Sequence, residues 1–160
     1  MYRLQHGELP PTLHPKVWWI LIGTNDINAG CSVETIVAGN IRIVQELQRH
    51  DHRHIAGPPA IVIVNSILPR GRQPLVVNEN SMWRTITAIN QQLACYASSS
   101  TSGVLFANVT DLLVQTRSND QKKILHPDMY MKDHLHLSVQ GSRVWETYMV
   151  DKVLSLRNSV

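Results

Sequence analysis

The chain has 160 residues, of which 43% are hydrophobic and 17% charged, and its formal net charge is +3. These values fit one globular domain that buries roughly two thirds of its unfolded surface, and the scattered Lys and Arg residues argue against a nucleic-acid-binding protein. The first 15 residues lack the apolar core of a signal peptide, and no apolar stretch is long enough to span a bilayer. We therefore expect a single domain over residues 1–160, located in the cytoplasm, with no nucleic-acid partner and no membrane span.

The first half of the chain predicts a strand, a helix and a loop. Residues 16–23 (KVWWILIG) form a nearly continuous apolar run, which is typical of a strand buried on both faces. Ser32 is suited to cap a helix, and apolar residues then recur at helical spacing to about residue 49. Residues 50–59 (HDHRHIAGPP) are polar and end in two prolines, which predicts a solvated loop.

The same alternation continues to the end of the chain. Further strands are expected at residues 60–67 and 103–109, and further helices at 79–96 and 139–156. Strands that alternate with helices predict an α/β fold of three layers, with a parallel sheet between helices. Functional groups of such sheets gather beyond the carboxyl ends of the strands, and that is where Asn25, Asn65 and Asn108 fall.

The segment MYMKDHLHLSVQGSRVW carries a possible catalytic pair. Asp133 and His136 are three residues apart just before a predicted helix, so a single turn can bring the carboxylate to the imidazole. A carboxylate that accepts from one ring nitrogen fixes the histidine tautomer and leaves the other nitrogen free to take a proton from a nucleophile.

The same segment offers an alternative, a metal site, because several of its side chains are common metal ligands: His126, Asp128, Asp133, His134 and His136. No separate Cys or His pair completes such a shell, so we expect no metal and no other cofactor. Cys31 and Cys95 lack metal-ligand spacing and are expected to be two buried free thiols.

Taken together, IGTND, LPRGRQP and DHLHLSVQG, in this order and at these intervals, resemble three sequence blocks of the SGNH hydrolases, also called GDSL-type esterases and acylhydrolases. The preceding RLQHGEL is similar to a segment of the same family. The resemblance covers nearly the whole chain, and it implies a flavodoxin-like parallel sheet.

The resemblance also implies roles for individual residues. Asn25 matches the asparagine whose amide donates to the oxyanion, His136 matches the catalytic base, and Asp133 matches the carboxylate that orients it. Gly23 would let the backbone turn tightly before Asn25. Arg70 resembles a position that could touch substrate, although an exposed loop arginine is the expectation from the residues alone.

The sequence departs from the family pattern at the nucleophile. The family takes its serine from a Gly-Asp-Ser segment, and a second oxyanion donor from a glycine, both upstream of the region that RLQHGEL resembles. No Gly-x-Ser-x-Gly turn occurs here; Ser32 is expected to cap a helix, and Ser66 lacks a strained turn. We expect no nucleophile within this chain, a truncated amino-terminal side, and one unpaired side on the strand at residues 16–23.

Two functions remain open at this point. The first is a serine esterase or acylhydrolase that cleaves small carboxylic esters through a Ser-His-Asp mechanism, with the serine supplied upstream. The second is an inert homologue that acts as an interaction subunit, for example in a homodimer or heterodimer with a related chain.

Overall fold

The computed structural model describes residues 3–54, 57–71, 81–100 and 103–157. The chain divides into two compact units, and each is described by itself. Unit one comprises Met1–Ile67 and Ala88–Ala107, and unit two comprises Leu68–Thr87 and Asn108–Val160. Helix α3 (Ser81–Ser99) begins in unit two and ends in unit one. That the chain is one domain stays a prediction.

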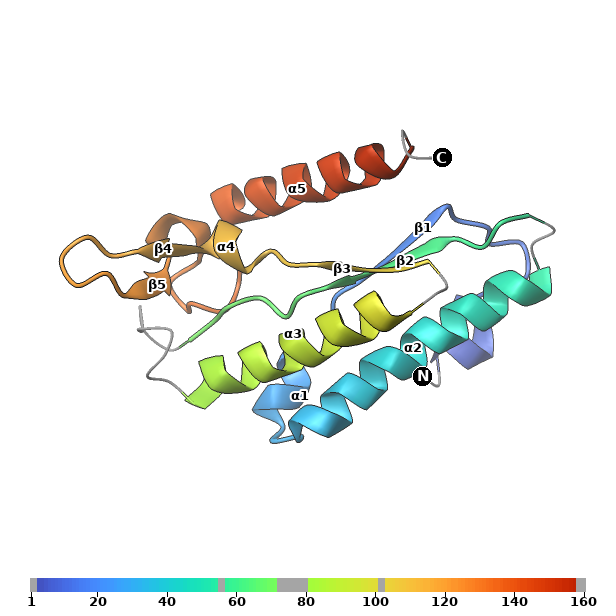
Figure 1. Cartoon of the computed structure of the whole chain (residues 1–160), viewed down its shortest axis with the longest axis horizontal. Helices are drawn as coiled ribbons and strands as arrows, with labels where there is room; N and C mark the ends of the chain where they lie inside the picture. The colour runs from blue at the N-terminus through green and yellow to red at the C-terminus, as the bar shows by residue number, and fades with distance from the viewer. Residues whose placement is uncertain (1–2, 55–56, 72–80, 101–102, 158–160) are drawn as a thin grey trace. The chain divides into compact units, whose positions relative to one another are not determined.

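Unit one is built on a parallel sheet in the order β1-β2-β3, formed by β1 (Val17–Ile20), β2 (Ile61–Asn65) and β3 (Val104–Ala107). Helix α2 (Val33–His54) connects β1 to β2, and α3 connects β2 to β3. Because such crossovers are right-handed and the strands are added in one direction, both helices must lie on the same face. Figure 1 shows α2 and the unit-one part of α3 on one side of the sheet. The predicted α/β class and parallel sheet are confirmed.

The strands differ in burial according to their place in the sheet. Val62, Ile63 and Val64 of the central β2 have no exposed surface, whereas all four residues of β1 are only half-buried. Among the described strands, β1 pairs with β2 alone, as predicted for a strand with one unpaired side.

Helix α2 is longer than predicted, because it continues through residues 50–54, where the sequence predicts a solvated loop. Asp51 is 1% exposed, and its Oδ2 accepts from Trp18 Nε1 at 3.2 Å and from the Ala60 amide at 3.1 Å. His50 is also buried, with Nε2 3.0 Å from the Leu13 carbonyl oxygen. The loop prediction is wrong here because these polar side chains have partners elsewhere in the chain, which satisfy them without water.

Unit two contains small elements that the sequence does not predict. They are α4 (Thr110–Leu113), the antiparallel pair β4 (Val114–Thr116) and β5 (Lys123–Leu125), and the 3₁₀ helix η2 (Pro127–Met129). The long helix α5 (Val139–Arg157) is close to its prediction. Strands of three residues are too short to show a period, which explains why they were missed. The buried core of this unit consists of Trp83, Val109, Leu113, Leu125, Met129 and Tyr130.

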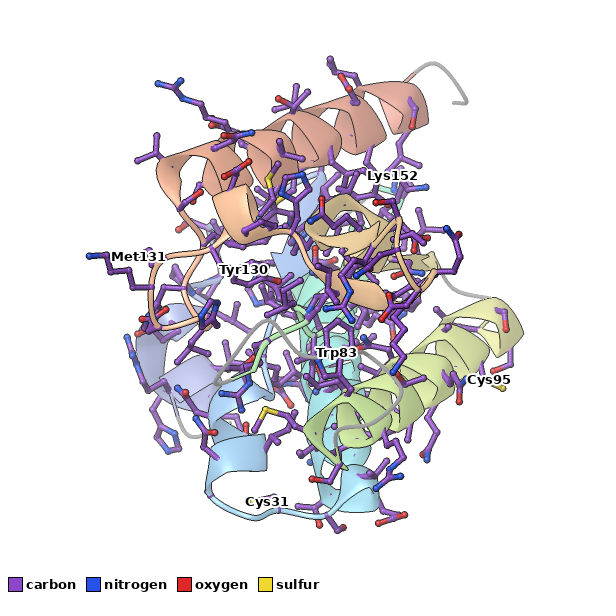
Figure 2. All side chains as sticks on the ribbon, turned by 90° about the vertical axis from the view of Figure 1, so that its left-hand side faces the viewer. Cys31, Trp83, Cys95, Tyr130, Met131 and Lys152 are labelled. Carbon is purple, nitrogen blue, oxygen red and sulfur yellow. The ribbon has the colours of Figure 1, made fainter. Side chains whose placement is uncertain are left out.

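Two further short helices belong to unit one, the π-helical turn η1 (Leu4–Glu8) and α1 (Thr24–Asn28). The two free cysteines also lie there, well apart (Figure 2), Cys31 half-buried and Cys95 exposed. The expectation of two buried thiols is therefore wrong. None of the helices in the described part of the chain combines the length and the apolar character needed to cross a membrane.

Candidate active site

The structure brings Asp133 and His136 together in unit two. Nδ1 of His136 lies 2.6 Å from Oδ2 of Asp133, while Oδ1 of the same carboxylate accepts from the backbone amides of Leu135 and His136, each at 3.0 Å. Both side chains are exposed, His136 by 69% and Asp133 by 46%. The spacing of three residues predicted this contact correctly.

These bonds decide where the imidazole proton sits. The hydrogen bond from the His136 side chain, and next those from the two backbone amides, hold the pKa of Asp133 well below its usual range. An ionised carboxylate can only accept hydrogen bonds, so Nδ1 must carry the hydrogen. In the neutral imidazole, Nε2 then keeps its lone pair and can take a proton, as a general base requires.

A closed loop carries this pair. Tyr130 and Leu137 form an antiparallel bridge, the Met131 amide donates to the His136 carbonyl at 2.8 Å, and the His134 amide donates to the Met131 carbonyl at 3.0 Å. His134 has φ of +52°, a left-handed conformation that few residues other than glycine adopt. Such backbone strain is often found at functional sites.

The loop is tied to residues 69–71, which belong to the predicted LPRGRQPLV segment. The Tyr130 hydroxyl donates to the Pro69 carbonyl, and the Gly71 amide donates to the His134 carbonyl at 3.1 Å. Arg70, between them, is 4% exposed, and burial lowers the pKa of its guanidinium. The expectation of an exposed loop arginine is therefore wrong, because its neighbours fix the segment against the loop. Residues 72–80 lie outside the described residues.

The start of α5 is packed against the other end of this loop. Ser138 caps the helix, since its Oγ accepts from the Gly141 amide at 3.1 Å and donates to the Asp128 carbonyl at 2.5 Å. Gly141 allows the approach: an added Cβ would overlap the Met129 carbonyl oxygen and lie 2.9 Å from its carbon. Sequence reasoning quoted this glycine within DHLHLSVQG but gave it no role, and missed Tyr130 altogether, because both act through contacts that spacing does not show.

Asn25 and Gly23 belong to unit one. Strand β1 ends at Ile20, and Asn25 lies exposed in the first turn of the short helix α1 rather than in a simple turn after the strand. Gly23 has φ of +112°, which residues with a side chain rarely adopt, and an added Cβ would lie 2.7 Å from Ile67 Cδ1. The meeting of Asn25 with His136 stays a prediction, because the two belong to different units.

The other two asparagines at strand ends have local partners. Asn65 is buried, its Oδ1 accepts from Trp19 Nε1 at 3.2 Å, and its amide donates to the Ser66 carbonyl at 2.7 Å. Asn108 Oδ1 accepts from the Thr110 amide at 3.1 Å. These bonds stabilise the ends of β2 and the entry to α4.

Of the serines that the sequence singled out, Ser32 is placed as predicted, and the lack of a strained turn at Ser66 stays a prediction. Ser32 caps α2, since its Oγ accepts from the Thr35 amide at 3.2 Å. Ser66 has no exposed surface, so an ester could not reach its hydroxyl without rearrangement.

The alternative metal site finds no support in this geometry. Within residues 3–54, 57–71, 81–100 and 103–157, no three His, Cys, Asp or Glu side chains converge as a metal ion would need. Two of the five candidate ligands, Asp133 and His136, already bind each other through the carboxylate and Nδ1.

Comparison with known proteins gives the family of the chain. Residues 1–144 match the model of the GDSL-like lipase/acylhydrolase family. The platelet-activating factor acetylhydrolase IB subunit alpha1 of Homo sapiens is 31% identical over 141 residues, which cover 88% of this chain and 52% of the relative. The Mus musculus protein of the same name is 30% identical over the same coverage. The chain thus spans about half the length of the curated relatives it matches.

Two solved structures also align with this chain. A protein from Streptococcus pneumonia, described as a platelet activating factor, aligns with a TM-score of 0.65 and 26% identity over 86% of this chain and 59% of its own. A protein from Bacteroides fragilis, described as an acylhydrolase, aligns with a TM-score of 0.72 over 97% of this chain and 68% of its own. At 20% identity, the second likeness shows the fold alone.

Proposed function

Because this chain belongs to the GDSL-like lipase/acylhydrolase family, we propose that it serves as the base-carrying part of an ester hydrolase that cleaves acyl or acetyl esters. The observation that carries the proposal is the 2.6 Å contact between His136 Nδ1 and the Asp133 carboxylate. It leaves Nε2 as the base that would take a proton from a serine hydroxyl and return it to the leaving alcohol.

Asn25 is proposed as a donor to the oxyanion of the tetrahedral intermediate. Its side chain is exposed, and it lies two residues after Gly23, the left-handed residue that precedes α1. One such donor, aimed at the developing negative charge, is worth on the order of 3 kcal/mol of the barrier.

The nucleophile is proposed to come from outside these 160 residues. Ser32 is used as a helix cap and Ser66 is buried, so neither is arranged to attack an ester. The names of the curated relatives make an acetyl ester the first substrate to test.

An inert homologue that acts as an interaction subunit is the second candidate. This candidate is favoured because Ser32 serves as a helix cap and Ser66 is buried. It is also favoured by the position of β1 at the edge of the sheet, where a partner chain could add a strand. In that case Asp133 and His136 would persist without turning over an ester.

Turnover of p-nitrophenyl acetate separates the two candidates. It should be measured on the protein carrying whatever upstream sequence its transcript encodes. For an esterase, His136→Ala should lower kcat on the order of 10⁴-fold or more, and Asn25→Ala about 10²- to 10³-fold. His52→Ala and Asn28→Ala, which alter exposed residues of α2 and α1, should leave kcat near that of the parent. Hydrolysis that His136→Ala leaves unchanged would exclude the proposed mechanism.

A further inference from the structure

The pair of Asp133 and His136 is too exposed to hold its geometry unaided. Exposed ion pairs contribute little stability, because water competes for both groups and the side chains lose conformational freedom on pairing. Yet a base acts well only when its ring is fixed relative to the reacting groups. Besides the bonds within residues 130–137, which we call the catalytic loop, contacts from another part of unit two would hold the ring more firmly.

Residues 69–71, which we call the clamp segment, contact the catalytic loop at two places. At the base of the loop, the Tyr130 hydroxyl donates to the Pro69 carbonyl, and at its tip the Gly71 amide donates to the His134 carbonyl at 3.1 Å. The two contacts lie on either side of Asp133 in the chain. Two bonds on opposite sides of the carboxylate restrain the loop more than either bond alone.

The contact at Tyr130 lies in the buried core of unit two. Tyr130 is 6% exposed, and burial raises the pKa of its hydroxyl, so the group remains a donor at every pH at which an esterase works. A buried carbonyl that loses its donor costs about 1–3 kcal/mol, which opposes opening of the contact. Figure 2 shows Tyr130 lying inside the molecule while the adjacent Met131 points outward, so the chain passes from core to solvent at the base of the loop.

We propose that the clamp segment fixes the catalytic loop through these two bonds, and that Tyr130 is thereby a positioning residue for the His136 imidazole. The inference rests on the proposed function, in which His136 is the base. Tyr130 does not touch the reacting atoms; it acts by holding the backbone from which Asp133 and His136 extend.

The test observes the imidazole itself. A histidine Nδ1 proton held by a carboxylate gives a proton NMR resonance at low field, separate from the backbone amides. In the parent protein that resonance should be present, and Asp133→Asn should abolish it. Tyr130→Phe, which removes only the hydroxyl, should also cause its loss at 25 °C. Gly71→Pro, which removes the other donor, should do the same with Tyr130 intact.

Two variants serve as matched controls. Tyr96→Phe makes the same chemical change at a half-buried tyrosine of unit one. His134→Gly keeps the carbonyl acceptor and accepts the left-handed φ. Both should retain the resonance, and circular dichroism should show every variant folded.

The outcomes distinguish the clamp from the proposed function. A resonance that survives Tyr130→Phe and Gly71→Pro but not Asp133→Asn would overturn the clamp and leave the catalytic pair standing. If the resonance survives in Tyr130→Phe but the Tm of that variant is lowered, Tyr130 has a purely structural role, which also overturns the proposal. Absence of the resonance from the parent protein would instead remove the Asp133–His136 pair on which the proposed function depends, and the clamp with it.

Discussion

Gly141 and Gly39 both lie inside long helices, and the structure predicts opposite effects when each is replaced by alanine. Alanine favours a helix over glycine by about 1 kcal/mol. At Gly39 in α2, an added Cβ would have nothing within 4 Å, so Gly39→Ala should stabilise the protein by up to that amount. At Gly141 in α5, the same methyl group would meet the backbone of Met129.

The magnitude for Gly141→Ala follows from what the methyl group would have to displace. It would overlap the Met129 carbonyl oxygen and lie 2.9 Å and 3.1 Å from the carbonyl carbon and Cα. That carbonyl also accepts from the Ser138 amide at 2.9 Å, so it cannot swing aside without losing a bond. Overpacking typically costs about 1–3 kcal/mol. Taking the upper value against the helix gain leaves about 2 kcal/mol of destabilisation.

Thermal unfolding followed by circular dichroism measures both variants. For a chain of this size, Gly141→Ala should lower Tm by roughly 4–8 °C, and Gly39→Ala should raise it by roughly 2–4 °C. Equal increases in Tm for the two variants would refute the reasoning, since they would mean that α5 does not press on Met129.

Three further changes test other parts of the structure. Gly23→Ala should lower the free energy of unfolding by about 1–3 kcal/mol, because its methyl group would lie 2.7 Å from Ile67 Cδ1 at a left-handed φ, and urea unfolding would show it. Asp51→Ala should cost about 1–3 kcal/mol by leaving two donors without an acceptor, whereas Asp151→Ala at an exposed site of α5 should change the stability little. The hydrogen bond from the Arg117 side chain lowers the pKa of Asp120 from 3.8 to about 2. Because the ionised carboxylate is favoured in the folded state, this pKa shift stabilises the protein above about pH 4, and the stabilisation is lost as pH falls through about 2. The Tm of the parent should therefore exceed that of Asp120→Asn above about pH 4, and the difference should shrink as pH falls towards 2.

The sequence predicted those elements whose causes are local. Strand β2 is a continuous apolar run because it is central and covered on both faces, and the contact of Asp133 with His136 spans three residues. Ser32 was identified as a cap because a cap bonds within its own first turn.

Two of the errors share a different cause, which is distance along the chain. Asp51 lies 33 residues from Trp18, so HDHRH looks like a solvated loop although its helix is held by buried bonds. Arg70 was wrongly expected to be exposed. The residues on either side of it bond to Tyr130 and His134, about 60 residues further along the chain, and such bonds leave no periodic pattern in the sequence. The helical turn around Asn25 is only five residues long, too short to show a period.

The proposed site takes its parts from regions that depend on different contacts. Asp133 and His136 are close in the chain, so their contact costs little entropy of loop closure and needs only residues of unit two. Asn25 lies in α1, which follows β1, a half-buried edge strand of unit one. A segment that paired with β1 and also supplied a serine would fix the oxyanion donor and complete the triad while leaving the Asp133–His136 pair unchanged. The Asp133–His136 pair would then form without this segment. The rate that the segment adds would come from the nucleophile and the oxyanion donors.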